Sequence, residues 1–186
     1  MKELEDRILK DGKVLPGDIV KVGSFLNQQI DIKLLEHMAQ EVKKNFDGVT
    51  KVLTIETSGL PLATMVSYLY SVDMVFAKKS KTANVDGEFV TAEVASFTHG
   101  NTNTIYINKE YIKPGDKVLI VDDFLALGNA LKGLITLCDK CGASVVGCAV
   151  QIEKEYQGGG NLLRDQGYKV LSLAQIKEIK DTEIIF

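Results

Sequence analysis

The sequence is short of several residue types, and each shortage excludes a class of structure. Of its 186 residues, three are cysteine, three are proline and none is tryptophan. Three cysteines are an odd and sparse set, so we exclude a disulfide framework and expect a reducing compartment. No apolar run approaches the roughly 20 residues of a membrane span, and the charged start MKELEDRILK lacks the apolar segment of a signal peptide. We therefore expect a cytoplasmic protein.

An excess of positive charge is also missing. Lysine and arginine together number 22 against 25 aspartates and glutamates, which gives a formal net charge of −3. A surface with this balance has no bulk attraction for nucleic acid or for an anionic membrane. We therefore expect neither as a partner, and any anion-binding site must be local.

Two of the cysteines form the sequence CDKC, at Cys138 and Cys141. A redox-active CxxC begins a helix, where the dipole lowers the thiol pKa, but this pair precedes Gly142 and is expected to close a helix. A zinc site needs four ligands, and the third cysteine and both histidines lie far away without paired spacing. We therefore predict buried structural cysteines.

Short apolar runs alternate with helical ones along the chain. The apolar runs predict buried strands, at 51–56, 75–79, 118–123, 144–153 and 168–173. Helical spacing and capping residues predict helices over 2–10, from Asp31 to Asp47-Gly48, over 60–70 and between a small-residue loop and Gly142. This alternation is typical of an α/β fold in which helices cover both faces of a parallel sheet. The length and the 45% hydrophobic content favour one domain.

The segment between Lys79 and Lys113 breaks this alternation. Within it, EFVTAEVASF and NTIYI predict an exposed hairpin rather than a strand–helix unit. An insertion of this length in a compact domain is usually functional or mobile. Two interpretations stay open, namely a lid over an active site and an edge hairpin or dimer contact.

The stretch VLIVDDFLALGNA, residues 118–130, places two adjacent acids at the end of a predicted buried strand. Ligands of open α/β sheets bind beyond the carboxyl ends of the strands, so Asp122 and Asp123 are candidate ligand contacts. Their mutual repulsion is relieved by a vicinal diol that donates hydrogen bonds, or by a magnesium shell. The small-residue loop that follows leads into a helix, and its backbone N–H groups form a phosphate cradle. A diol site beside a phosphate site predicts ribose 5-phosphate.

One rival for the same residues is the receiver domain, in which paired acids after the first strand bind magnesium. Here only about a third of the chain follows Asp122, which is too little for a doubly wound domain of about 100 residues. The nucleotide fingerprints GxGxxG and GxxxxGK[ST] are absent as well. The alternative to a ligand site is a strand that ends in a turn, with both acids solvated and without a functional role.

VLIVDDFLALGNA closely resembles the phosphoribosyl pyrophosphate (PRPP) signature of type I phosphoribosyltransferases. IETSG (55–59) resembles the pyrophosphate loop of that family, FAKK (76–79) its basic strand end and 80–113 its flexible hairpin. Together with VKVGSFLNQQID near the N-terminus and VQIEKEYQ (150–157), the resemblance to the purine branch covers nearly the whole chain.

The fold that this resemblance implies is the type I phosphoribosyltransferase fold. It has a parallel sheet core flanked by helices, a flexible hairpin at 80–113 and a small N-terminal hood. Residues 1–186 are then expected to form a single domain, in which about 1–35 contribute to a base-binding hood. The resemblance also implies a homodimer and Mg²⁺ bound with PRPP rather than directly by the protein.

The resemblance assigns PRPP contacts to two segments after strands. Asp122 and Asp123, the catalytic acids, would hold the ribose hydroxyls. The 5-phosphate would lie against the loop made by Ala126, Leu127, Gly128, Asn129 and Ala130. Because Leu127 has no hydroxyl, backbone amides and Asn129 must make more of the phosphate contacts than in the commoner A-T-G-G-T loop.

The pyrophosphate of PRPP would lie against the segment after the first core strand. There the resemblance assigns backbone N–H groups of Thr57, Ser58 and Gly59, with a strained peptide conformation as one possibility. Lys79 would supply the cation, and Lys78 is the alternative.

The base would be read by Val20 and Asn27 from the hood and by Lys154 after the fourth strand, with Tyr156 as a candidate aromatic neighbour. Asn27 can donate to or accept from a ring nitrogen, whereas Lys154 can only donate. Xanthine has an oxo group at C2 where guanine has an amine, so a lysine at that edge favours xanthine by roughly 1–3 kcal/mol. Val20 packing in a core, Asn27 in a turn and Lys154 as a solvated lysine are the alternatives.

The expected activity is purine salvage by transfer of the 5-phosphoribosyl group from PRPP to xanthine, which gives xanthosine 5'-monophosphate and pyrophosphate. Two alternatives stay open. The first is an enzyme of the same fold that prefers guanine or hypoxanthine. The second is a regulator that senses PRPP or nucleotides, which the absence of a DNA-binding module and the negative charge disfavour.

Overall fold

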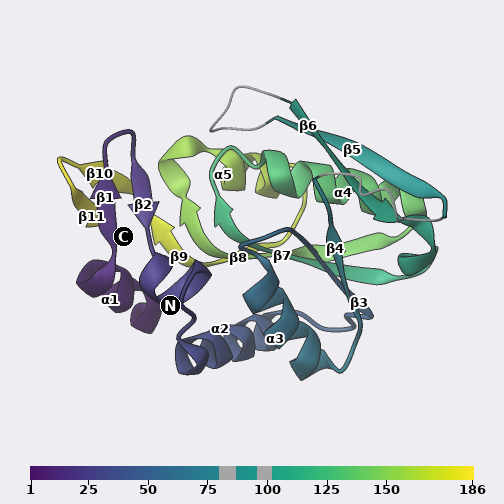
Figure 1. Cartoon of the computed structure of the whole chain (residues 1–186), viewed down its shortest axis with the longest axis horizontal. Coiled ribbons are helices and arrows are strands. Elements are labelled where there is room, and N and C mark those ends of the chain that lie inside the picture. The colour runs from purple at the N-terminus through teal and green to yellow at the C-terminus, as the bar shows by residue number, and fades with distance from the viewer. Residues whose placement is uncertain (80–86, 96–101) are drawn as a thin grey trace.

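The computed structural model describes residues 1–79, 87–95 and 102–186, and a five-stranded parallel sheet lies at its centre (Figure 1). Every neighbouring pair in this sheet runs in the same direction. The strands follow the order β4 (Met74–Ala77), β3 (Lys51–Ile55), β7 (Lys117–Leu125), β8 (Ser144–Lys154) and β9 (Val170–Ile176). The predicted α/β class and parallel sheet are therefore confirmed.

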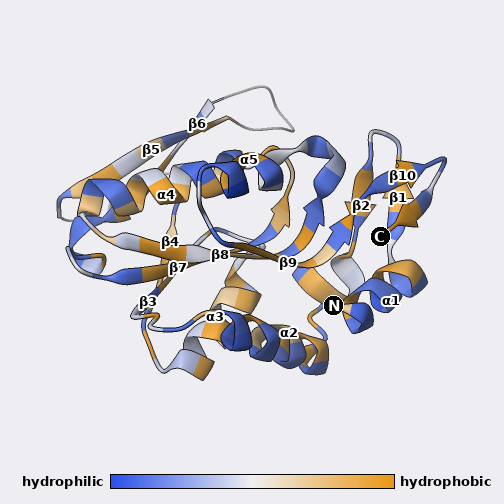
Figure 2. Ribbon diagram, turned by 180° about the vertical axis from the view of Figure 1, so that it is seen from behind, coloured by the Kyte–Doolittle hydropathy of each residue, from blue (hydrophilic) through white to orange (hydrophobic). Residues whose placement is uncertain are grey.

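Helices cover both faces of this sheet, as predicted. In Figure 1, α2 (Ile32–Asn45) and α3 (Leu60–Tyr70) lie below the sheet, and α4 (Asn129–Cys141) and α5 (Gly159–Asp165) lie above it. Each face has its own cluster of buried apolar residues, one with side chains from α2 and α3 and the other with side chains from α4 and α5. The central strands are accordingly coloured as hydrophobic along much of their length (Figure 2).

The residues expected to begin and end these helices do so. The Asp31 carboxylate accepts a hydrogen bond from the Leu34 N–H at 3.2 Å and caps α2. Gly142 takes a left-handed conformation, with φ of 70°, directly after α4. Cys138 and Cys141 lie in the last turn of α4, buried and free like Cys148. Burial raises the pKa of Cys138 and of Cys148 to about 12, so the structural interpretation of these cysteines is confirmed.

A smaller subdomain from both ends of the chain lies beside the carboxyl end of the sheet, and we call it the hood. Its N-terminal part is α1 (Lys2–Asp11), β1 (Lys13–Leu15), β2 (Ile19–Lys21) and the single-turn π-helix η1 (Gly23–Asn27). Its C-terminal part is the hairpin of β10 (Glu178–Lys180) and β11 (Glu183–Ile185), which lies against α1 and β1. The N-terminal ammonium donates to the Leu173 carbonyl in β9 and so joins the hood to the sheet.

The predicted hairpin is present as β5 (Phe89–Ala95) paired antiparallel with β6 (Thr102–Asn108). It packs on α4 so closely that a Cβ on Gly133 would lie 2.4 Å from Val94 Cγ2. Backbone hydrogen bonds between Lys78 and Tyr106 connect it to the end of β4. Residues 80–86 and 96–101 of the predicted segment 80–113 lie outside the described residues, so its flexibility stays a prediction.

Several boundaries and elements differ from the sequence prediction. Strand β4 ends at Ala77, two residues before the predicted end, and β7 continues past the acids to Leu125. The extension of β7 follows from pairing, because Leu125 still pairs with Glu153 of β8. Helix α5 and the strands of the hood were not predicted, because each is too short for a clear periodic pattern.

A buried ion pair fixes α5 to the sheet. The Glu153 carboxylate is 1% exposed and accepts hydrogen bonds from Arg164 Nη1 at 2.9 Å and Nη2 at 2.6 Å. It also accepts from Gln175 Nε2 at 3.1 Å and from the Ser172 hydroxyl. Burial raises the pKa of Glu153, but the hydrogen bonds from Arg164, Ser172 and Gln175 outweigh it and hold the pKa below its ordinary value.

None of the described helices has both the length and the apolar content that a membrane crossing requires.

We expect Arg164→Met to lower the free energy of unfolding by about 3 kcal/mol at pH 7, because it leaves a buried carboxylate without its cation. The pKa of Glu153 is depressed in the fold, so this stabilisation is present above the ordinary value of 4.5 and is lost as the pH falls through the folded-state value. Urea unfolding at pH 7 and at lower pH measures both effects. Lys44→Met, which removes an exposed pair with Glu41, is the control and should change stability by less than about 0.5 kcal/mol. Equal midpoints for the Arg164 variant and the native protein at pH 7 would contradict the assignment.

Candidate active site

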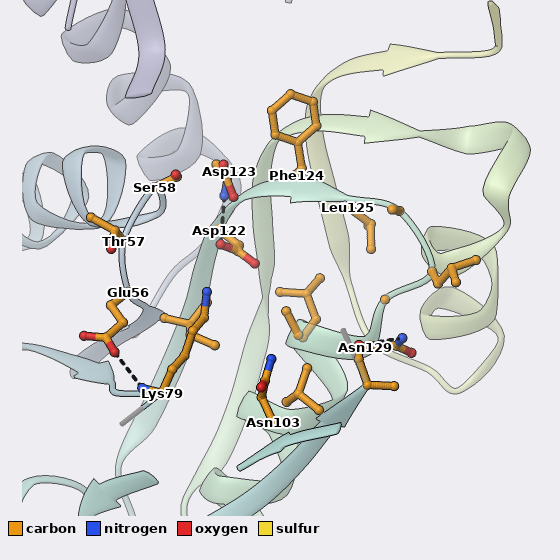
Figure 3. Close-up of a pocket in the computed structure, with 18 residues that line it drawn as sticks. Glu56, Thr57, Ser58, Lys79, Asn103, Asp122, Asp123, Phe124, Leu125 and Asn129 are labelled. Atoms are coloured by element: carbon orange, nitrogen blue, oxygen red, sulfur yellow. Dashed lines mark hydrogen bonds between the residues drawn. The ribbon is translucent and has the colours of Figure 1, made fainter. Parts of the chain in front are cut away.

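A polar cavity of about 340 Å³ lies at the carboxyl edge of the sheet. Parallel strands bring their carboxyl ends to one edge, so segments far apart in the sequence meet there. Figure 3 shows the residues after β3 on one side, the end of β7 above and the start of α4 opposite. The described residues that line it include Glu56, Thr57, Ser58, Lys79, Asn103, Asp122, Asp123 and 124–131.

The two acids lie where β7 passes the cavity. Asp122 is 4% exposed, and its Oδ1 accepts the backbone N–H of Asp123 at 3.0 Å. Burial and the adjacent Asp123 raise the pKa of Asp122 well above its ordinary value, and burial also raises the pKa of Asp123. The positive charge of Lys79 opposes both shifts. The site therefore favours groups that donate hydrogen bonds to these oxygens.

Lys79 is the cation of this cavity. In Figure 3 its side chain extends toward Asp122, and its backbone N–H donates to Glu56 Oε1 at 2.6 Å. Lys78 instead lines a separate cavity at the sheet edge, with its ammonium 6.0 Å from the centre of the Phe76 ring. The geometry thus selects Lys79 from the two predicted candidates as the lysine beside the acids.

The loop after β7 presents the start of a helix to the cavity. Residues 126–130 line it, and Gly128, with φ of 81°, precedes the first residue of α4. A helix of this length attracts an anion at its N-terminus through its dipole and its free N–H groups. The start of α5 supports the loop, because the Gly159 N–H donates to the Ala126 carbonyl at 3.1 Å. The loop is therefore shaped for a phosphate group.

Asn129 has a second contact that the sequence did not predict. Its Nδ2 donates to the Ala95 carbonyl at 3.1 Å, which joins the start of α4 to the end of β5. One N–H of the side-chain amide is therefore engaged, and its second N–H and the backbone N–H groups are the further donors of this loop. Leu127 is 41% exposed and offers no polar group.

The segment predicted for pyrophosphate follows β3. Thr57 and Ser58 line the cavity, whereas Gly59 precedes α3 as its N-cap residue and does not line it. The peptide bond between Glu56 and Thr57 is cis. Glu56 and Asn103 line the cavity although neither was predicted. Glu56 could have been found from its place at a strand end, while the hairpin residue Asn103 has no sequence signal.

The three residues predicted to read the base lie outside the lining of this cavity, at the junction with the hood. Val20 is buried in β2, and Asn27 is the last residue of η1. Lys154 Nζ donates to the carbonyl of Asp18, next to β2, at 2.7 Å. The structure thus brings Lys154 to the strand that contains Val20.

Burial lowers the pKa of Lys154, and the negative charge of Asp18 opposes that shift. Tyr156 is 39% exposed, and burial followed by the charge of Asp18 raises its pKa. Asp18 therefore contacts Lys154 through its backbone carbonyl and raises the pKa of Tyr156 through its charge. The sequence did not indicate either interaction.

Comparisons with known proteins agree with this arrangement. A family model described as "Phosphoribosyl transferase domain" matches residues 21–184. The xanthine phosphoribosyltransferase of Lactobacillus delbrueckii subsp. bulgaricus is 48% identical, over 100% of both chains. That of Bifidobacterium adolescentis is 47% identical over 96% of this chain and 94% of its own.

Solved structures show the same fold at low identity. The APRTase from Giardia lamblia complexed with 9-deazaadenine superposes with a TM-score of 0.80, at 22% identity over 94% of this chain and 98% of that one. The adenine phosphoribosyltransferase from Rhodothermus marinus gives a TM-score of 0.73, at 23% identity over 95% and 100%. With the family match and the high coverage of the relatives, these likenesses show that the chain belongs to the phosphoribosyltransferase family and has its type I fold.

Proposed function

We propose that this chain is a purine salvage enzyme that transfers the 5-phosphoribosyl group from PRPP to xanthine, giving xanthosine 5'-monophosphate and pyrophosphate. The observation behind this proposal is the cavity in which an acid pair, a lysine and a helix N-terminus meet. Each feature suits one part of PRPP, and the relatives named xanthine phosphoribosyltransferase support the choice of base.

The subsites follow from the chemistry of the lining. Asp122 and Asp123 accept hydrogen bonds from the ribose hydroxyls, and the loop of residues 126–130 donates backbone N–H groups to the 5-phosphate. Lys79 and the segment of Thr57 and Ser58 lie on the side of the acids where pyrophosphate would leave (Figure 3). Gly59 does not line the cavity, and it would support this subsite as the residue that begins α3 directly after Thr57 and Ser58.

The reaction builds positive charge on the sugar and negative charge on the leaving group, and it inverts the anomeric carbon. The acid pair then stabilises the sugar, and the lysine stabilises the pyrophosphate. Closure of the 80–113 segment would exclude water, which would otherwise hydrolyse PRPP. We assign no strong general base, so positioning of the two substrates supplies much of the rate.

Magnesium would accompany PRPP. Among the described residues no group of three or more histidine, cysteine, aspartate or glutamate side chains is placed to hold a metal ion. Burial raises the pKa of both acids, and either hydrogen-bond donors or a nearby positive charge would favour their ionised form. This arrangement fits an ion whose ligands are oxygens of PRPP and water, and which neutralises charge on pyrophosphate.

The base would lie between the sheet edge and the hood, so that residues 1–35 and the rest of the chain work as one domain. Val20 in β2 and Asn27 at the end of η1 would contribute to this region from the hood, and Lys154 would contribute from the end of β8. As a pure donor, the Lys154 ammonium favours the C2 oxo group of xanthine over the amine of guanine. It would exchange its contact with the Asp18 carbonyl for the base.

A homodimer would cover an apolar surface that the chain leaves exposed on α2 and α3. Ile32 is 60% exposed and Tyr68 is 76% exposed. We call this surface the α2–α3 face, and it is formed by Ile30, Ile32, Leu35, Pro61, Thr64, Met65 and Tyr68. Contiguous apolar surface of this kind is typical of protein interfaces.

The proposed activity is tested by incubating the protein with PRPP, Mg²⁺ and each of xanthine, guanine, hypoxanthine, adenine and orotate. We expect nucleotide formation to be fastest with xanthine and much slower with guanine. Turnover fastest with hypoxanthine or adenine would contradict the role of Lys154, and no turnover with any base would favour a PRPP-sensing regulator.

We expect Asp123→Asn to lower kcat/KM for PRPP by about a hundredfold, because a charged acceptor of the ribose hydroxyls is lost. The pKa of Asp123 is higher in the fold than its ordinary value of 3.8. The folded state therefore loses stability relative to the unfolded chain as the pH rises from 3.8 through the folded-state pKa. The variant should therefore unfold at the same or a higher urea concentration at pH 7. Asp139→Asn, at the exposed far end of α4, is the control and should keep full activity. Near-normal turnover in the Asp123 variant would refute the acid-pair assignment.

We expect Lys154→Met to reduce kcat/KM for xanthine by about ten- to a hundredfold and to reduce guanine use much less, because only xanthine loses a hydrogen-bond partner at C2. Steady-state kinetics with both bases measure the ratio. Lys33→Met, on the exposed side of α2, should leave the ratio unchanged. An equal loss for both bases would show that Lys154 holds the hood rather than reads the base.

We expect the double variant Ile32→Lys and Tyr68→Lys to be a monomer in size-exclusion chromatography with light scattering, whereas the native protein is a dimer. Burial of a lysine in an apolar interface carries a large desolvation cost. Tyr111→Lys changes a 57% exposed tyrosine on another surface and should stay dimeric. A dimeric double variant would place the interface elsewhere.

A further inference from the structure

Thr54 is a buried polar residue at the centre of β3. It is 0% exposed, and its neighbours in sequence are the buried apolar residues Leu53 and Ile55. Its Oγ1 has no hydrogen-bond partner among the described residues. A buried hydroxyl without a partner destabilises a fold, so valine would be the better residue here if packing were its sole role.

The hydroxyl of Thr54 lies close to the carboxylate of Asp122. A Cβ placed on Gly59 would be 2.3 Å from Thr54 Oγ1 and 3.0 Å from Asp122 Oδ1. The two oxygens therefore approach the same point on the Gly59 backbone, which is open because residue 59 has no side chain. Strands β3 and β7 are neighbours in the sheet and pair as far as Leu53 and Ile120, so Thr54 and Asp122 both lie near the same edge of the sheet.

Apart from the Thr54 hydroxyl, few groups around Asp122 favour its ionised form. Asp123 on the same strand opposes ionisation, and the Cys148 thiol on β8, with a pKa of about 12, is neutral. Lys79, after β4, favours ionisation, as does the Asp123 N–H. A carboxylate accepts most strongly from ribose hydroxyls when it is ionised, and it then has room for about four hydrogen bonds. A further donor from β3 would supply one more of the hydrogen bonds that the Asp122 carboxylate can accept.

We propose that Thr54 is a positioning residue for phosphoribosyl transfer, whose hydroxyl donates to the Asp122 carboxylate when the ribose of PRPP is bound. The donor comes from the strand beside β7 and would occupy one lone pair of the carboxylate, which leaves the others for the ribose hydroxyls. In the absence of PRPP the hydroxyl is unpaired, and the cost of burying it is recovered when the substrate binds. This inference rests on the proposed ribose site at Asp122.

The test compares Thr54→Val, which keeps the shape and removes the hydroxyl, with Thr54→Ser, which keeps the hydroxyl. Thermal unfolding is measured with and without PRPP and Mg²⁺, and kcat/KM for PRPP is measured against pH at saturating xanthine. Thr54→Ala repeats the comparison with a smaller side chain and serves if the valine variant does not fold.

We expect Thr54→Val without PRPP to unfold at the same or a higher temperature than the native protein, because an unpaired buried hydroxyl has been removed. The PRPP concentration needed to raise its unfolding temperature should increase about tenfold, and kcat/KM for PRPP should fall by a similar factor. The acid limb of its pH profile should move to higher pH, because the ionised carboxylate has lost a donor. Thr54→Ser should resemble the native protein in all three measurements.

Three results would overturn the inference. In the first, Thr54→Val binds PRPP and turns over like the native protein with an unchanged pH profile. In the second, Thr54→Ser loses as much as Thr54→Val, which would indicate a packing role. In the third, the native protein neither responds to PRPP in thermal unfolding nor forms nucleotide. The last result would remove the proposed function as well, whereas the first two leave it intact.

Discussion

The burial of two adjacent carboxylates at the end of β7 is the constraint on which the rest of the site depends. Desolvation raises the pKa of Asp122 and Asp123, and nearby groups decide whether they can accept hydrogen bonds as anions. Lys79 offsets part of this cost, and its position is fixed in turn by the carboxylate of Glu56. The acids lie in β7, whereas the cation and the residue that orients it follow β4 and β3, so the site exists only when these three strands are side by side.

The contacts that hold the loop after β7 and the end of β8 also join distant parts of the chain. The loop after β7 is supported by Gly159, which comes from the start of α5, and its first helical residue, Asn129, is bonded to the hairpin. On the opposite side, Asp18 of the hood approaches Lys154 and Tyr156, which follow β8. Each of these contacts depends on the tertiary fold, in which apolar clusters pack on both faces of the sheet.

Local patterns predicted the long elements well and the short ones poorly. The helix over 60–70 is found at Leu60–Tyr70, and Asp31 caps α2 as its side chain suggested. The predicted end of β4 at residue 79 was wrong, because FAKK resembles a continuing strand while the pairing with β3 stops at Ala77. The hood hairpins β1–β2 and β10–β11, with three residues per strand, have no periodicity to detect, and they depend on packing between the two ends of the chain.

By itself, the sequence determined the fold class and indicated the acid pair and a candidate phosphate loop, since each is a local pattern of apolar period, charge and small residues. It favoured Lys79 over Lys78 only through the family resemblance, and the fold then places Lys79 at the cavity and Lys78 at the sheet edge. Nor did it reveal Asp18 or the role that we propose for Thr54, since each residue is ordinary in its own segment. Their roles arise from contacts across strands and between chain ends, and only the tertiary structure brings those atoms within reach of one another.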